Sequence, residues 1–192
     1  MSTRGFLGFL ADGRETITYV HHDAYPSGLG ADALAWARGV TDWDTVRKQA
    51  AELVHIDADV RPTPEQYTAL AQYADPTVGA KDKPEPEEEW YRLLRRTLGD
   101  PAASLAGGHA AHNPDWPGDS LWCEWGYLID CDERRFEVYA GLQTAPRAGR
   151  FAGRATNPRS GYHAVKLLVS WPLDGLPDDD EFGRLGDGDL TL

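Results

Sequence analysis

The sequence predicts an α+β protein in which a mostly antiparallel sheet, built from an N-terminal and a C-terminal hairpin, is packed against about three to four helices. Strand-like patterns lie near both ends of the 192-residue chain, and helix signals are concentrated between them. Two hairpins that flank a helical middle bury most apolar surface when they share one sheet and the helices cover it. The length fits one domain, residues 1–192, with a full core.

A β-hairpin is expected over residues 4–22. Within the first strand, residues 4–11, Gly5 to Leu10 form a nearly continuous apolar run, whereas residues 16–20 alternate as a strand covered on one face does. Asp12 and Gly13 supply the turn between the two strands. In register, this hairpin brings the start of its first strand beside the end of its second strand.

Helix-start and helix-stop signals dominate the middle of the chain. Thr63 to Gln66 combine an N-cap hydroxyl, a proline at the first helical position and an acceptor three residues after the cap. Thr41 to Asp44 resemble a capping box, and Gly39 and Gly99 end the helices that precede them. Helices are therefore expected over residues 31–38, 41–55, 63–75 and 87–98.

The remaining segments predict loops, strands and a tail. The region near 79–89 is rich in Lys, Asp, Glu and Pro and predicts a surface loop, and residues 100–119, which show little periodicity, predict a longer one. Alternating patterns predict a second hairpin over residues 121–140 and a last strand over 162–171. Residues 174–192 predict an acidic tail.

The composition argues against several classes of partner. The formal charge of −12, from 19 basic and 31 acidic residues, disfavours nucleic acid, because binding to a phosphate backbone depends on Lys and Arg contacts. No window approaches the ~18 uncharged residues that a membrane span needs, so no membrane partner and a cytoplasmic location are expected. Cys123 and Cys131 lack the spacing of a disulfide framework or a zinc site and are expected to be buried free thiols.

Chemistry-bearing side chains are concentrated where the second strand ends, in the run from His21 to Ser27. Adjacent strand residues face opposite sides, so at most one of His21 and His22 points into a given pocket. His22, oriented by a carboxylate, is a candidate base, although histidines at strand ends are also common surface residues. Asp23, Tyr25 and Ser27 are spaced by two and share a face if the segment stays extended, which makes Asp23 and Tyr25 candidate catalytic residues.

Arg4 is the candidate anion-binding residue. The hairpin register places its guanidinium, which grips carboxylates and phosphates in bidentate fashion, beside His22 and Asp23. Ser27 and Gly28 of the glycine-rich turn complete the expected ligand-binding set. The alternative is a structural ion pair between Arg4 and Asp23.

Glu124 is a further catalytic candidate because it lies between Trp122 and Trp125 on a predicted strand. An apolar setting would raise the pKa of its carboxyl group and make it a proton donor. The alternative is an exposed carboxylate on the face of the sheet opposite Trp125.

A metal site is not expected. His109 and His112, followed by Asp115, have the short spacing of a metal half-site. Gly107 and Pro114 leave little room for a helix that would align them, and a metal site needs at least three fixed ligands. We therefore expect neither a metal nor another cofactor.

Two segments carry a resemblance to other proteins. One is the Thr3-Arg4 start of the first strand with the Asp-x-Tyr-Pro-Ser-Gly-x-Gly pattern of residues 23–30, and the other is the Cys-Glu-Trp-x-Tyr pattern of residues 123–127. They resemble a family of uncharacterised proteins found in bacteria, phages and fungi, in which Trp is usual at the position of His22. The resemblance implies no activity, and it implies a shared site at Arg4, Asp23, Tyr25 and Glu124.

Two functions from different classes remain open. The first is a small enzyme that acts on a small polar or anionic substrate, such as an amide hydrolase or a transferase. Removal of Met1 would expose Ser2 at the start of the first strand, the place of the nucleophile in N-terminal nucleophile hydrolases, although the resembled family often has Gly there. The second is a non-catalytic module that binds an anionic ligand through Arg4 and the glycine-rich turn, or another protein through some of the seven tryptophans.

Overall fold

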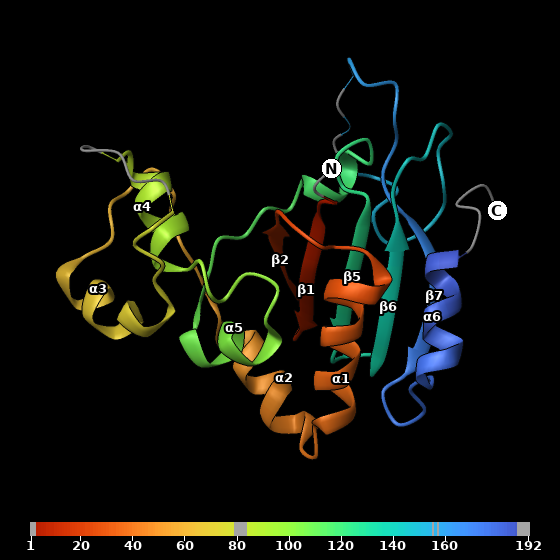
Figure 1. The fold of residues 1–192 in the computed structure, drawn as a ribbon, viewed down its shortest axis with the longest axis horizontal. Helices are drawn as coiled ribbons and strands as arrows, with labels where there is room; N and C mark the ends of the chain where they lie inside the picture. Colours follow the sequence, from red (N-terminus) through yellow and green to blue (C-terminus); the bar gives the residue numbers. More distant parts are fainter. Residues whose placement is uncertain (1–2, 79–83, 155, 157, 188–192) are drawn as a thin grey trace.

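The computed structural model describes residues 3–78, 84–154, 156 and 158–187. The main sheet consists of β1 (Gly5–Ala11), β2 (Arg14–Val20), β5 (Trp125–Asp130), β6 (Arg135–Ala140) and β7 (Lys166–Pro172). Its strands run in the order β2-β1-β5-β6-β7, and every neighbouring pair is antiparallel except β1 and β5, which are parallel (Figure 1). The predicted α+β class, with a mostly antiparallel sheet from two hairpins, is confirmed.

Six α-helices lie within the described residues, where about three to four were expected. They are α1 (Ala31–Gly39), α2 (Trp43–Glu52), α3 (Pro64–Leu70), α4 (Pro86–Leu93), α5 (Pro101–Gly107) and α6 (Asp179–Asp187). Short helical turns occur at η1 (Pro26–Gly30), η2 (Ala71–Tyr73) and η3 (Trp116–Gly118). The short strands β3 (Val54–His55) and β4 (His109–Ala110) pair in parallel as a second sheet.

The helix cap at α3 forms as the sequence indicates, whereas at α2 the expected box of Thr41 and Asp44 is replaced by a cap at Asp42. The Thr63 hydroxyl accepts from the Gln66 N–H at 3.3 Å, and Gln66 Oε1 accepts from the Thr63 N–H at 2.8 Å, so both halves of the capping box form at α3. At α2 the cap is Asp42, whose Oδ1 accepts from the N–H groups of Asp44 and Thr45. These bonds satisfy N–H groups that a helix start otherwise leaves unpaired.

The two extra helices form in stretches that looked unstructured in the sequence. In the expected loop over 100–119, Asp100 caps α5, and Gly108 ends it with the left-handed φ of 65°. In the expected acidic tail, α6 places Phe182 in the core, where it is only 3% exposed. Of the loop expected near 79–89, residues 79–83 lie outside the described part of the chain, and α4 begins at Pro86.

Helices and a long loop cover opposite faces of the main sheet. Leu7 and Phe9 of β1 pack with residues of α1, α2 and α6, whereas Phe6 packs with Leu128 and with Phe151 of the loop that precedes β7. Because β1 lies between β2 and β5 and is buried on both faces, its sequence is an almost continuous apolar run. The cysteines, Cys123 and Cys131, are buried free thiols as predicted.

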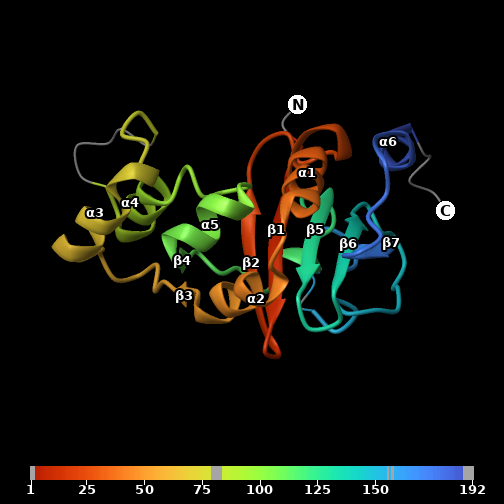
Figure 2. The ribbon, with the colours of Figure 1, turned by 90° about the horizontal axis from the view of Figure 1, so that it is seen from below.

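A small helical unit lies beside the β2 edge of the sheet, at the opposite end of the molecule from α6 (Figures 1 and 2). Leu70, Trp90, Leu93 and Leu94 form its own apolar core between α3 and α4. The chain that leads back from it protects the sheet edge, since the Asn113 N–H donates to the Ile17 carbonyl at 2.8 Å. None of the described helices is both long enough and apolar enough to cross a membrane.

Candidate functional site

The candidate site lies where β2 ends and β1 begins, since the register pairs Gly5 with Val20. Parallel pairing of β1 with β5 brings the start of the second hairpin to the same place, because Gly5 also pairs with Trp125. Arg4, the residues after Val20 and Glu124 therefore meet at one end of the sheet. The proximity of these residues was predictable from the expectation that the two hairpins share one sheet.

Five of the seven predicted site residues line one open cavity of about 390 Å³. The predicted residues are His22, Asp23, Tyr25, Ser27 and Gly28, and Leu98 and Gly99 form part of the opposite wall. The Tyr25 hydroxyl donates to Asp23 Oδ1 at 3.0 Å. This hydrogen bond, and then the negative charge of Asp23, raise the pKa of Tyr25.

The glycines of this turn have a structural role. A Cβ on Gly28 would lie 2.3 Å from the Asp23 carbonyl oxygen, and a Cβ on Gly30 would lie 2.7 Å from the Tyr127 ring. The close approach lets the Leu29 N–H donate to the Asp23 carbonyl at 2.8 Å and closes the turn that leads into α1. Much of the Asp-x-Tyr-Pro-Ser-Gly-x-Gly pattern is thus explained by the backbone path alone.

Arg4 and Glu124 do not line that cavity, and two hydrogen bonds from backbone N–H groups join them. The Arg4 N–H donates to Glu124 Oε1 at 3.3 Å, and the Arg4 carbonyl accepts from the Glu124 N–H at 2.9 Å. The guanidinium carbon of Arg4 lies 4.9 Å from the centre of the Trp122 ring. Within the described part of the chain Arg4 and Asp23 form no ion pair, so the structural alternative considered for Arg4 is absent.

The histidine that accompanies Arg4 is His21 rather than His22. Phe6 pairs with Tyr19 in the ladder, and strand alternation then puts Arg4, Tyr19 and His21 on the same face. The Tyr19 hydroxyl and His21 Nδ1 are hydrogen-bonded, and the rings of His21 and His22 meet edge to face with centres 4.2 Å apart. Trp116 packs edge-on against Tyr19 at 4.7 Å and so fixes the phenol ring.

Positive charge gathers around His21. Burial, followed by the charges of His22, Arg4 and Arg95, lowers the pKa of His21. Burial also raises the pKa of Tyr19, against the positive charge of Arg4. Consequently a neutral imidazole and a protonated phenol are hydrogen-bonded between cationic groups at neutral pH. We call Arg4, Tyr19, His21, His22 and Arg95 the strand-end cluster.

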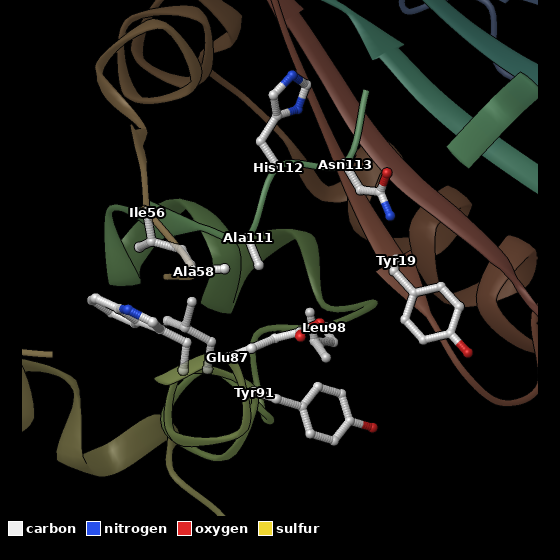
Figure 3. Close-up of a pocket in the computed structure, with 11 residues that line it drawn as sticks. Tyr19, Ile56, Ala58, Glu87, Tyr91, Leu98, Ala111, His112 and Asn113 are labelled. Carbon is white, nitrogen blue, oxygen red and sulfur yellow. The ribbon is translucent and has the colours of Figure 1, made fainter. Parts of the chain in front are cut away.

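A second cavity, of about 230 Å³, separates the β2 edge from α4. Tyr19 and Tyr91 line it, and Figure 3 shows their hydroxyl groups on the same side, away from Ile56 and Ala58. The Arg95 guanidinium carbon lies 5.7 Å from the centre of the Tyr91 ring. Its apolar lining comes from both the helical unit and the connecting chain and consists mainly of Ile56, Trp90, Leu94, Leu98 and Ala111.

The histidines of the metal half-site are engaged in separate contacts. His112 Nδ1 accepts from the Ile17 N–H at 3.0 Å, and its ring stacks on His55 with centres 4.1 Å apart. His109 instead stacks on Trp90, with ring centres 6.4 Å apart. No group of three or more His, Cys, Asp or Glu side chains arranged to hold a metal occurs in the described residues.

The sequence analysis missed the roles of Tyr19 and Arg95. Tyr19 carries a local signal, since it lies two positions before His21 and so shares a face with it. Arg95 carries no such signal, because only the packing of the helical unit beside β2 brings it near His21. Ser2, the proposed nucleophile, lies outside the described residues.

Comparisons of the chain with protein-family models, with curated proteins and with solved structures found no significant match. The resemblance to the bacterial, phage and fungal family stays a prediction. The function of the site therefore has to follow from its own chemistry.

Proposed function

We propose that this protein binds a small anionic molecule at the strand-end cluster. The observation that carries the proposal is the Nε atom of Arg4, which is buried and has no hydrogen-bond partner among the described residues. A buried donor left unpaired costs about 1–3 kcal/mol, and an oxygen of a bound carboxylate or phosphate removes that cost by accepting from it.

The surroundings of Arg4 support an anionic ligand. Trp122 holds the guanidinium by a cation–π contact, which limits its motion without using its N–H donors. Arg95 adds a second positive charge near His21, in a protein whose formal net charge is −12. Such a local concentration of positive charge attracts anions against the overall field of the molecule. Glu124, the neighbouring carboxylate, accepts from the backbone N–H of Arg4.

The experiment is a titration of the protein with acetate and with inorganic phosphate, followed by the NMR signal of the Arg4 Nε–Hε group. We expect this signal to shift on saturation and the affinity to fall at least about tenfold in Arg4→Gln. Arg184→Gln, which removes an exposed arginine on α6, is the matched control and should keep the affinity within about twofold. Equal affinities in wild type and Arg4→Gln would refute the proposal.

Catalysis is the second candidate, and the Tyr19–His21 pair favours it. The lowered pKa of His21 keeps the imidazole available as a base, and the phenol beside it can return a proton. A hydrolase or transferase that acts on a small anionic amide would use both groups, with Asp23, Tyr25 and Glu124 as the other catalytic candidates. Release of amine from N-acyl amino acids, lost in His21→Gln, would support this function, whereas binding without turnover would leave the binding module.

The other expectations on partners and place also stay proposals. They are a small-molecule ligand, no nucleic-acid partner and a cytoplasmic location. The small-molecule ligand would follow from an anion site confined to one end of the sheet, and the lack of a nucleic-acid partner from the formal net charge of −12.

A further inference from the structure

The cavity between β2 and α4 adjoins the strand-end cluster, because Tyr19 belongs to both. The ring of Tyr19 lines the cavity, while its hydroxyl is hydrogen-bonded to His21. Tyr91 also belongs to both surroundings, since its ring lines the cavity and the Arg95 guanidinium lies over that ring. The two phenol rings therefore line a mainly apolar cavity, which we call the chamber (Figure 3), and each also contacts a member of the strand-end cluster.

The chamber suits an apolar group the size of one ring. Its volume of about 230 Å³ exceeds the ~150 Å³ of an engineered apolar cavity that takes up benzene. Trp90 and Leu94 in its wall are only 4% and 1% exposed. The Trp90 Nε1–H donates to the Val60 carbonyl at 2.7 Å, so the single hydrogen-bond donor of this side chain needs no acceptor from a ligand.

We infer that the anion bound at the strand-end cluster is a monocarboxylate with an apolar ring or branched body, and that this body occupies the chamber beneath Tyr19 and Tyr91. The inference rests on the proposed function, because it takes the cluster as the site of the negative charge. Glu87, an exposed carboxylate at the start of α4, also lines the chamber and repels a second negative charge. A single carboxylate therefore fits this site better than a phosphate dianion.

The test compares three probes that share parts of this structure: acetate, 3-phenylpropionate and 3-phenylpropanamide. In calorimetric titrations of the full chain we expect 3-phenylpropionate to bind at least about tenfold more tightly than either of the others. Glu87→Gln should tighten the binding of 3-phenylpropionate, since it removes the repelling charge.

A variant that fills the chamber separates the two proposals. Ala58→Phe should abolish the advantage of 3-phenylpropionate and leave the affinity for acetate within about twofold, which also reports that the variant is folded. Ala35→Phe, at an exposed alanine of α1, is the matched control and should keep the advantage.

The outcomes of these titrations distinguish failure of the inference from failure of the proposed function. If acetate and 3-phenylpropionate bind equally and both need Arg4, the inference about the apolar body fails and the proposed anion site stands. If 3-phenylpropanamide binds as tightly as 3-phenylpropionate, the linkage between chamber and cluster is refuted. If no probe depends on Arg4, the proposed function itself fails.

Discussion

The backbone N–H of Arg4 donates a hydrogen bond to Oε1 of Glu124, and the Glu124 N–H donates to the carbonyl of Arg4. The first bond measures 3.3 Å and the second 2.9 Å. The side chain of Glu124 thus continues the parallel pairing of β1 and β5 by one residue and fixes the point where Arg4 leaves the sheet. This relationship makes Glu124 a positioning residue for the strand-end cluster.

Replacements of Glu124 should show whether its acceptor oxygen or its negative charge stabilises the protein. Glu124→Ala removes the acceptor for the Arg4 N–H and should lower the free energy of unfolding by about 1–2 kcal/mol. Glu124→Gln keeps an acceptor oxygen and should lose less than about 0.5 kcal/mol. Urea unfolding checks both values, and an equal loss in the two variants would show that the charge, rather than the acceptor, is what matters.

Gly28 should tolerate no side chain. Gly28→Ala places a Cβ 2.3 Å from the Asp23 carbonyl oxygen, and because that atom belongs to the backbone the turn itself has to move. We expect a loss of about 1–3 kcal/mol in the free energy of unfolding. Gly39→Ala is the control, since nothing lies within 4 Å of its Cβ. It should be neutral or stabilising by up to about 1 kcal/mol, and similar losses at both positions would contradict the steric account.

Stability should fall on mild acidification because of His55. Burial, then the charges of His112 and Arg14, lower the pKa of His55 to about 4 from an ordinary value near 6.5. Between these values the unfolded state binds more protons, so the stabilising effect is complete above pH 6.5 and is lost as the pH falls towards 4. Burial likewise lowers the pKa of His112, which acts in the same direction.

The measurement is urea unfolding at about pH 7 and about pH 4.5. Wild type should lose about 1–2 kcal/mol more than His55→Gln, a figure reduced from the full pKa difference because the ring is partly open to water. Glutamine can still bond to Thr16, whose hydroxyl lies 2.8 Å from His55 Nε2. Parallel losses in the two proteins would rule out His55 as the cause.

Arg150 should be the most costly arginine to remove. It lies 2.5 Å from Asp130 and 3.1 Å from Glu137, two carboxylates whose side chains are 0% and 11% exposed. Arg150→Met leaves both negative charges buried on the same face of the sheet and should cost about 3 kcal/mol or more. Arg147→Met, from the same loop, is the control and should cost less than about 1 kcal/mol in a thermal melt. A melt of Arg150→Met close to that of wild type would show that the network is dispensable.

Local signals allowed much of the fold to be predicted from the sequence. Thr63 and Gln66 specify a helix start because a capping box involves residues only three positions apart. The turn at Asp12 and Gly13 specifies the first hairpin in the same way, since both residues adopt the left-handed φ that such turns need. The expectation that residues 16–20 are covered on one face only was wrong, since Thr16, Ile17 and Thr18 are all buried.

Long-range packing decided the rest. The acidic composition of α6 predicts solvation, yet Phe182 and Leu185 lie three positions apart on one helix face and pack on the sheet. The helix becomes stable only because the assembled sheet provides a surface on which these two side chains pack. An isolated helix of this length is marginal in water.

The candidate site shows the same division. Local sequence patterns were enough to predict that reactive side chains cluster after Val20 and that Arg4 begins the neighbouring strand. Which of them meet depends on long-range contacts: strand alternation pairs Arg4 with His21, parallel pairing adds Glu124, and the docked helical unit adds Arg95. The physical reason is that a hydrogen-bonded turn or cap is encoded by neighbours in the chain, whereas a shared charge environment depends on which distant surfaces bury one another.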